Sequence, residues 1–473
     1  MKTLRIMNKR LVCALVLALC CLQGQAQPLN NTKQPGYKGI WFTLGQESGY
    51  GYKYSGGLGT YTVKHNPMAV YAPEVDRTYF VYGGTTSAKD RHLLCMIGCF
   101  DHKTGRVQMP VCVFDKEKVN DPHDNPALQI DKDGYLWVFV SGRSKKRPGF
   151  IYRSDKPYDI NSFSQVLKLE MTYPQPMYDP EKGFLVGYTK YTGVRQLYWM
   201  TSADGSEWDQ GHHLADIKAP GDEKSGHYQV TGHDRAHGKI VTTFNRHLNG
   251  NCDTRTNIYY LQTLDYGKTW TTADGKLIQT PVTDVDSPCR ILDAQSKGQN
   301  VYIKDVNFDA DGNPVILYLT SYGHQPGPAH GPRDFWTANW NGKKWVFNHI
   351  CPTWHDYDSG SIWVDGRNWT VIVPSEPGPQ LWGTGGEIAV WKTRNAGKSW
   401  KKTAVLTSNS PFNHGYVRRP YGGTDPFFCY WADGNPDRIT ESRIYFSDSS
   451  GNVWVLPYDM KEEWETPTPY KKQ

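Results

Sequence analysis

Residues 263–270 read Thr-Leu-Asp-Tyr-Gly-Lys-Thr-Trp, and this stretch decides the fold. Asp265 can accept hydrogen bonds from the backbone N–H groups of a turn, and Gly267 can supply a positive φ. Trp270 follows at the start of an apparent strand, where its large side chain can pin the turn to a hydrophobic core. The stretch therefore predicts a tight β-hairpin with an aromatic anchor.

The same unit of a turn followed by a tryptophan recurs along the chain. Successive anchor tryptophans are 71, 62, 75, 55 and 54 residues apart. A period of this size indicates a repeat architecture, in which each unit packs on its neighbours. The six anchors are Trp137, Trp208, Trp270, Trp345, Trp400 and Trp454.

Short runs typical of β-strands lie between the turns, and helical periodicity is almost absent. Many of these runs alternate apolar with polar residues, as half-buried antiparallel strands do. Ten clear strands are expected at Tyr135–Ser141, Gln196–Ser202, Lys239–Phe244, Asn257–Thr263, Val301–Val306, Val315–Ser321, Thr370–Pro374, Ile388–Thr393, Arg443–Phe446 and Val453–Leu456.

The repeat length predicts the overall architecture. Dividing about 447 mature residues by a blade of roughly 60–65 residues gives about seven units. We therefore predict an all-β fold, a seven-bladed β-propeller of four-stranded antiparallel blades, with six or eight blades as alternatives. One domain is expected over residues 27–473, and the ring is expected to close by pairing strands near residues 443–457 with N-terminal strands. If Lys239–Phe244 is the innermost strand of its blade, both of its ends approach the axis.

The first 26 residues have the pattern of a secretory signal peptide. Four basic residues precede the apolar run Leu11–Leu22, and Gly24-Gln25-Ala26 supplies small residues before the expected cleavage point. The run is too short to span a bilayer, and no later segment could cross a membrane. We therefore expect a secreted or periplasmic protein.

Charge and cysteine content exclude several classes of protein. The chain is formally +6, and removal of the signal peptide leaves about +2 with both signs mixed along the sequence. Nothing in this pattern calls for a nucleic-acid partner or an acidic membrane surface. Seven cysteines remain after cleavage, which is an odd number and too sparse for a disulfide framework. A monomer is expected.

Three stretches in the N-terminal half carry candidate functional residues. A glycine-rich segment contains Lys53, Lys64 and His65, which could bind an anion such as a uronate, although a tight entry into the first blade explains it equally well. His123 lies between aspartates in a proline-bounded turn and could act as a general acid or base, or be a satisfied turn histidine. Tyr188 and Arg195 could form a proton donor and a carboxylate ligand, or be ordinary strand residues.

Three further stretches lie later in the chain. His233, Arg235 and Arg246 form a polar cluster that could bind substrate or be a solvated loop. Glu387 and Arg419 could face a cleft, or form a buried structural pair. Required cofactors are not indicated, but a structural metal ion is possible, because the residues at 289, 351 and 355 include two cysteines and a histidine. A buried cysteine pair beside a turn histidine is the more ordinary explanation.

These stretches, in this order, resemble a BNR-repeat family of secreted bacterial polysaccharide enzymes. The resemblance spans nearly the whole mature chain and implies a seven-bladed propeller. The family includes ulvan lyases and related exo-α-L-rhamnosidases that remove rhamnose capping glucuronic acid on arabinogalactans. The runs that carry the resemblance are Lys53–Tyr61, Lys64-His65, Asp121–Pro126, Thr189–Arg195, His355–Ser361, Gly385–Glu387 and Val417–Pro420.

The resemblance also implies roles for particular residues. In the lyase branch, His123 matches a catalytic histidine, and Tyr188 and Arg195 are the candidates for the catalytic tyrosine and the uronate-neutralising arginine. In the rhamnosidase branch, the expected catalytic histidine falls near Gln46, whose amide does not titrate. We predict a propeller of the rhamnosidase type acting on an acidic plant or algal polysaccharide or oligosaccharide, impaired by Gln46. A uronate polysaccharide lyase and a non-catalytic glycan-binding propeller are the alternatives.

Overall fold

The computed structural model describes residues 27–58, 64–87, 93–117, 119 and 121–472. The predicted signal peptide, residues 1–26, lies outside the described residues. The described chain is built almost entirely of antiparallel strands, together with four short 3-10 helices: η1 (Pro122–Asp124), η2 (Arg235–His237), η3 (Gln295–Lys297) and η4 (Pro328–His330). The all-β class is therefore confirmed. Among these residues, no helix is long and apolar enough to cross a membrane.

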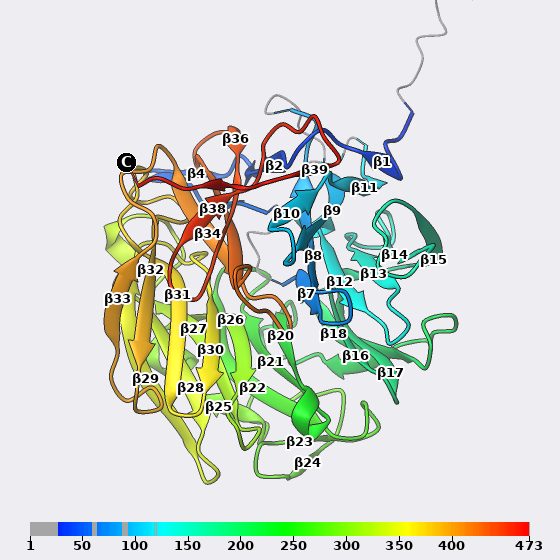
Figure 1. The fold of residues 1–473 in the computed structure, drawn as a ribbon. Helices are drawn as coiled ribbons and strands as arrows, with labels where there is room; N and C mark the ends of the chain where they lie inside the picture. The colour runs from blue at the N-terminus through cyan, green and yellow to red at the C-terminus, as the bar shows by residue number, and fades with distance from the viewer. Residues whose placement is uncertain (1–26, 59–63, 88–92, 118, 120, 473) are drawn as a thin grey trace, which may run out of the picture.

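Six sheets are each built from strands that lie close together in sequence, and they follow one another around a ring (Figure 1). Four of them have four strands: β12 (Pro126–Ile130) to β15 (Phe163–Leu169), with β13 (Leu136–Val140) and β14 (Gly149–Ser154); β16 (Thr172–Asp179), β17 (Gly183–Lys190), β18 (Gln196–Ser202) and β19 (His212–Ala215); β26 (Asn300–Phe308), β27 (Pro314–Ser321), β28 (Arg333–Trp340) and β29 (Trp345–Thr353); and β30 (Ser361–Asp365), β31 (Asn368–Glu376), β32 (Glu387–Thr393) and β33 (Lys401–Val405).

The two remaining sheets of this kind are larger. One contains β20 (Gly226–Asp234), β21 (Lys239–His247), β22 (Arg255–Thr263), β23 (Trp270–Thr271), β24 (Leu277–Ile278) and β25 (Arg290–Leu292). The other contains β34 (Asn413–Arg418), β35 (Cys429–Gly434), β37 (Ile444–Ser447), β38 (Val453–Val455) and β40 (Thr468–Pro469).

A composite sheet of nine strands joins the two ends of the chain. Its central strands are β7 (Ala69–Ala72), β8 (Arg77–Gly84), β9 (Leu94–Asp101), β10 (Arg106–Gln108) and β11 (Val111–Asp115). Its other strands are β1 (Thr32–Lys33), β2 (Gly39–Ile40), β36 (Glu441–Ser442) and β39 (Trp464–Glu465). Two small ribbons, β3 (Phe42–Thr43) with β6 (Ser55–Gly56) and β4 (Glu47–Ser48) with β5 (Gly51–Tyr52), form an insertion near the N-terminus.

The described chain shows six blades built on four-stranded sheets, where seven were predicted, and two of the six carry additional strands. The prediction for ring closure also needs correction. Closure pairs β36 with β2 and β39 with β10, whereas the strands within residues 443–457 pair inside their own sheet. The red C-terminal strand β36 accordingly lies beside the blue strand β2 (Figure 1).

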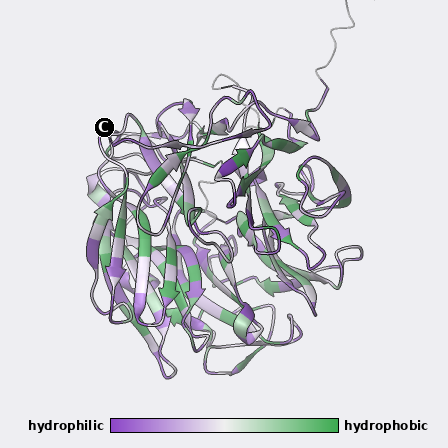
Figure 2. Cartoon of the chain, in the orientation of Figure 1, coloured by the Kyte–Doolittle hydropathy of each residue, from purple (hydrophilic) through white to green (hydrophobic). Residues whose placement is uncertain are grey.

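All ten predicted strands are present, with shifts of a few residues at their ends. Lys239–His247 is the second strand of its sheet, however, and the first strand, β20, contacts the first strands of the sheets on either side. Hydrophobic and hydrophilic residues are mixed along the strands (Figure 2), yet β20 and β22 are buried along their whole length. The expectation of half-buried strands fails there because each sheet is covered on both faces by its neighbours.

The turn at residues 263–270 has the predicted geometry. Asp265 accepts from the Thr269 backbone N–H at 2.9 Å and from its hydroxyl at 2.6 Å, and Gly267 has a φ of +90°. A Cβ on Gly267 would lie 2.4 Å from Trp199 Nε1, so the neighbouring sheet also requires glycine. Trp270 is buried against Trp199 with ring centroids 5.4 Å apart. The hairpin is therefore both a turn and a contact between sheets.

Candidate functional site

Polar and aromatic side chains gather at one end of the ring, where the first strands of the sheets begin. In an antiparallel sheet, the start of the first strand, the end of the second and the start of the third lie at the same end. The turn before β12, the loop between β17 and β18, the start of β20 and the loop between β21 and β22 therefore share this end. We call it the site end, and the end that carries the turn at residues 263–270 the box end.

His123 is held in a fixed orientation, as its turn predicted. It lies in η1, and its Nδ1 forms a short contact with the carboxylate of Asp121, which also accepts from the His123 backbone N–H at 3.0 Å. Arg143 and Arg147 donate to the same carboxylate at 3.1 and 2.5 Å. Because Nδ1 faces this carboxylate, it carries the proton, and the lone pair of the neutral ring lies on Nε2.

The environment keeps the His123 ring neutral and Asp121 charged. Burial lowers the pKa of His123; Asp121 opposes this shift, and Arg143 and Arg195 add to it, so that the net pKa is lowered. Burial by itself would raise the pKa of Asp121, but His123 and Arg147 more than offset this, and the net pKa is lowered. At neutral pH the dyad is therefore an imidazole, able to accept a proton, beside a carboxylate.

Two tyrosines connect His123 to an arginine. Tyr173 stacks on the His123 ring at 5.4 Å between centroids, and its hydroxyl lies 3.0 Å from that of Tyr191. The Tyr191 ring is partly exposed, and the guanidinium groups of Arg195 and Arg143 lie 4.8 and 5.5 Å from its centroid. Tyr191 is therefore placed between two cations and beside the His123 ring.

The arginine side of the site continues toward the middle of the ring. Arg195 Nη1 lies 3.4 Å from His247 Nε2, and its guanidinium also faces the ring of Tyr228 at 5.7 Å. Arg255 packs on the other side of this system, 3.8 Å from the Tyr228 centroid. Burial lowers the pKa of His247 to about 2, and Arg195 contributes further, so this imidazole is neutral.

Asp253 attaches the N-terminal insertion to this end of the ring. Its carboxylate accepts from the Tyr54 hydroxyl at 2.5 Å and from the Tyr357 hydroxyl at 2.6 Å, and it forms a short ion pair with Lys53. Lys53 and Tyr54 come from the insertion, whereas Tyr357 precedes β30. Three segments that are far apart in sequence therefore meet at one buried carboxylate, and Lys53 is fixed at the edge of the site.

Two of the predicted substrate-binding residues are buried in the centre of the ring. Lys64 Nζ donates to the Ile303 carbonyl at 2.9 Å, and burial together with Arg255, Lys304 and Arg418 lowers its pKa well below the usual value. His65 Nε2 lies 3.1 Å from the His123 carbonyl, and burial lowers the pKa of His65 to about 3. These side chains support the floor of the site from below.

The structure thus brings His123, Arg195, Lys53, Lys64 and His65 to the same end. Gln46 is exposed on the insertion, where its carbonyl accepts from the Lys53 N–H at 2.9 Å.

Tyr188, by contrast, is buried in the hydrophobic cluster that contains Phe139 and Phe184, and its ring lies 5.9 Å from that of Tyr198. It is Tyr191, just beyond the end of β17, that meets His123.

The other predicted residues have partners outside this cluster. His233 and Arg235 lie at the far end of β20, and the Tyr421 hydroxyl donates to the His233 carbonyl. Arg419 pairs with Asp305 at 3.4 Å. Arg246 is buried and pairs with Asp222 at 3.5 Å; Glu387 accepts from Ser410 at 2.8 and 2.9 Å. Arg246 is therefore buried in β21 and not on a solvated loop, and Glu387 and Arg419 have separate partners and do not pair with each other.

Sequence reasoning missed several members of the site. Tyr191, Tyr228 and Tyr357 fell within the stretches that were singled out, but no role was given to them. Asp253 lies in the turn between β21 and β22, and Arg255 begins β22; none of the candidate stretches included either residue. The available signal was an aspartate and an arginine two residues apart between two long apolar strands, a pattern that a plain turn does not require.

The predicted zinc ligands do not come together. Within the described ranges, no group of three or more His, Cys, Asp or Glu side chains has the spacing to hold a metal ion. The seven cysteines of the described chain are all free thiols.

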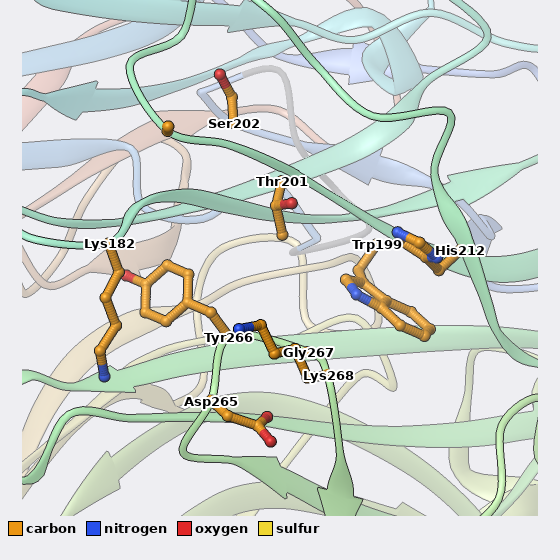
Figure 3. A pocket seen from close by; sticks show the side chains of 10 residues that line it. Lys182, Trp199, Thr201, Ser202, His212, Asp265, Tyr266, Gly267 and Lys268 are labelled. Atoms are coloured by element: carbon orange, nitrogen blue, oxygen red, sulfur yellow. The ribbon is translucent and has the colours of Figure 1, made fainter.

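An open pocket of about 530 Å³ lies at the box end, between β18 and the turn at residues 263–270 (Figure 3). Trp199, His212, Tyr266 and Lys182 line it, and the Trp199 and His212 rings stack at 5.0 Å. Only Asp265 among the lining residues has an acidic side chain, and its carboxylate is occupied by Thr263 and Thr269. The site end is the better candidate, because there an oriented histidine, a tyrosine and two guanidinium groups meet.

Comparisons with known proteins agree with this architecture. Residues 78–351 match the BNR repeat-containing family, and because the match covers more than half of the chain, the protein belongs to this family. No match was found among curated proteins.

Solved structures give the fold. A polysaccharide lyase, an ulvan lyase, superposes with a TM-score of 0.68 at 15% identity, over 88% of this chain and 96% of that one. The ulvan lyase bound to -[GlcA(1-4)Rha3S]- gives 0.67 at 14% identity, over 89% and 96%. At these identities the likeness establishes a β-propeller of the same fold and no more.

Proposed function

We propose that this protein cleaves uronate-containing polysaccharides by β-elimination. The observation that carries the proposal is the placement of Tyr191, which lies between two guanidinium groups and beside the neutral, oriented ring of His123. β-Elimination next to a carboxylate needs a cation to neutralise the carboxylate, a base for the proton at C5 and an acid for the leaving oxygen at C4. This cluster contains one group for each task.

Arg195 is the proposed ligand of the uronate carboxylate, with Arg143 beside it. Neutralisation makes the C5 proton more acidic, because the negative charge that develops on the carboxylate in the transition state is stabilised. Burial lowers the pKa of Arg195, but the phenols of Tyr191 and Tyr228 more than offset this, so the guanidinium stays charged. It is also supported by the neutral His247, which adds no competing charge.

His123 and Tyr191 are the proposed proton-transfer pair. The base removes the C5 proton, the C5–H electron pair forms the C4–C5 double bond, and the C4–O4 bond breaks toward the leaving sugar. O4 takes a proton from the phenol of Tyr191. The neutral His123 is suited to the role of base because its Nε2 carries a lone pair at neutral pH, while Asp121 stabilises the imidazolium that forms.

The proposed substrate is a polymer in which uronate alternates with a deoxyhexose, as in ulvan. The ulvan lyase that shares this fold was solved with a glucuronate–sulfated rhamnose repeat, which supports testing this class first. We also propose that the composite sheet is a seventh blade, because β7 contacts β12 in the way that the first strands of other sheets contact one another.

We further propose that the protein is secreted, acts on acidic plant or algal polysaccharides, and works as a monomer.

A hydrolase of the exo-α-L-rhamnosidase type is the second candidate. It is favoured only by the sequence resemblance around Gln46. Gln46 is an exposed side chain with no acid or base of its own, and it lies on a small ribbon outside the His123 cluster. A glycan-binding propeller without activity is the remaining alternative.

Ultraviolet absorbance tests the proposal directly, because the C4–C5 double bond of the product absorbs and a hydrolysis product does not. We expect absorbance to rise with ulvan or another uronate polymer, and to be lost in His123→Ala and Tyr191→Phe. Tyr188→Phe is the matched control, since that phenol is buried away from the cluster, and it should keep most of the activity. Reducing ends without absorbance would show hydrolysis instead.

Release of free rhamnose from a rhamnose–glucuronate disaccharide by the wild type, or only by Gln46→His, would favour the second candidate. Binding without any product would leave a glycan-binding propeller.

A further inference from the structure

Four large apolar side chains, two of them exposed and two half-buried, form a ridge at the site end. Tyr50 comes from the insertion, Trp354 from the loop before β30, and Leu381 and Trp382 from the loop between β31 and β32. We call these residues the aromatic ridge. Tyr50 and Leu381 are 48% and 40% exposed, which places them among the few large hydrophobic side chains that the described chain leaves in solvent.

The ridge is continuous, because its rings touch. Tyr50 and Trp382 meet edge to face at 5.9 Å and 71°, and Trp354 meets the other side of Trp382 at 5.9 Å and 74°. Tyr50 is also supported from below by Gly327, where a Cβ would lie 2.3 Å from the tyrosine ring and where φ is +99°. A contiguous exposed apolar patch is unusual on a monomeric protein and marks a place where something binds.

The ridge is joined to the proposed active site through the insertion. Tyr50 lies in the turn between β4 and β5, three residues before Lys53, which the Asp253 carboxylate holds at the site. A second anchor holds the same ribbon from the opposite side, since the Tyr52 N–H donates to Asp437 at 3.2 Å. Trp354 is likewise three residues before Tyr357, whose hydroxyl donates a hydrogen bond to the Asp253 carboxylate.

Sugar rings fit this surface better than a charged ligand does. The exposed rings supply flat apolar area, which stacks on the C–H face of a pyranose, and a deoxyhexose adds a methyl group to that face. The cationic groups of the site lie further along, at Lys53 and Arg195. A polymer that alternates uronate with deoxyhexose would therefore place its acidic rings on the cations and its neutral rings on the ridge.

We infer that the aromatic ridge is a distal subsite, which stacks on neutral sugar rings of the polysaccharide chain a few residues away from the scissile uronate. This inference rests on the proposed function for its substrate, but not for its test, because binding is measured without cleavage. It predicts that the protein prefers polymers to short oligosaccharides, since only a longer chain reaches both the His123 cluster and the ridge.

The experiment uses the full mature chain carrying His123→Ala, so that no substrate is consumed, and ulvan polymer as the probe in affinity electrophoresis. Adding Tyr50→Ala or Trp382→Ala should weaken polymer binding about tenfold each, the equivalent of about 1.4 kcal/mol for a lost aromatic contact. Tyr50→Phe should bind like the parent, because stacking does not need the hydroxyl. Leu264→Ala, which removes an even more exposed apolar side chain at the box end, should also have no effect.

The outcomes separate the two proposals. Polymer binding that depends on Tyr50 and Trp382, in a protein whose wild type makes no unsaturated product, would keep the ridge and reject the lyase. Cleavage by the wild type with unchanged polymer affinity in the ridge variants would keep the lyase and reject the ridge. Two further results would also overturn the ridge: absence of binding to ulvan and other uronate polymers, or burial of the ridge in a dimer seen by analytical ultracentrifugation and abolished by Trp382→Ala.

Discussion

The Asp253 carboxylate offers the sharpest test of how the site is assembled. We expect Asp253→Asn to lower the free energy of unfolding by about 3 kcal/mol and to loosen residues 42–56. The substitution keeps the shape of the side chain and one acceptor oxygen, but removes the charge that Lys53, Tyr54 and Tyr357 share. Loss of this charge should release the insertion before the ring itself unfolds.

The magnitude follows from three interactions. A hydrogen bond to a charged acceptor contributes about 1.5–3 kcal/mol and a neutral one about 0.5–1.5, so the tyrosine hydroxyls at 2.5 and 2.6 Å should each lose about 1 kcal/mol. Lys53 is only 15% exposed and loses its carboxylate partner, which adds about 1 kcal/mol. Burial raises the pKa of Asp253, but Lys53, Tyr357 and Tyr54 more than offset this, so its net pKa is lowered and the ionised form stabilises the fold.

Urea unfolding at neutral pH measures the first effect, and limited proteolysis at the insertion measures the second. Asp101→Asn is a matched control, because Asp101 is also buried and paired, with Arg77 at 3.0 Å, but lies in β9 away from the insertion. It should destabilise the protein without exposing residues 42–56. An Asp253→Asn protein within about 0.5 kcal/mol of the wild type, with unchanged proteolysis, would refute the reasoning.

Three further predictions concern stability. Burial lowers the pKa of His227 to about 4 and that of His414 to about 3, so below about pH 6.5 the unfolded chain binds protons that the folded chain does not. The urea midpoint should therefore be highest above about pH 6.5 and fall as the pH drops from there. A midpoint that rises toward pH 5 would contradict this. Within the described chain, both ring nitrogens of buried His233 lack hydrogen-bond partners, so His233→Phe should raise the free energy of unfolding by about 1 kcal/mol in a urea titration. A lower free energy of unfolding would show that the imidazole is needed. Asp265→Ala should lower the free energy of unfolding by about 1 kcal/mol, because Thr263 and Thr269 lose their acceptor, but it should leave cleavage of uronate polymers unchanged. A selective loss of cleavage would place the function at the box end.

The parts of the fold that the sequence could predict depend on local contacts. Asp265, Gly267 and Trp270 form their turn within eight residues, and the ten strands follow from runs bounded by turn residues. The number of strands in each sheet and the pairing that closes the ring could not be predicted in this way. They depend on two-residue strands such as β2 and β36, which have no periodicity to detect and which pair about 400 residues apart.

The candidate site could be predicted from the sequence only where a residue and its hydrogen-bond partner lie in the same turn. His123 was found because Asp121, which orients it, is two residues away. Tyr188 was the predicted tyrosine, and it lies inside β17 in a hydrophobic cluster. Tyr191, beyond the end of β17 at Lys190, is the tyrosine that contacts the His123 ring. Asp253 was missed because its partners Lys53 and Tyr357 are distant in sequence.

The two ends of the ring explain why the repeated turn says so little about chemistry. The turn at residues 263–270 joins the third and fourth strands of its sheet, and there Gly267 fits against Trp199 of the neighbouring sheet. That fit restricts the sequence. At the site end, the loops face the middle of the ring and one another, so the packing of neighbouring sheets leaves them free to differ. Cations, phenols and imidazoles can therefore accumulate there without disturbing the repeat, and function is best sought in the segments that break the period.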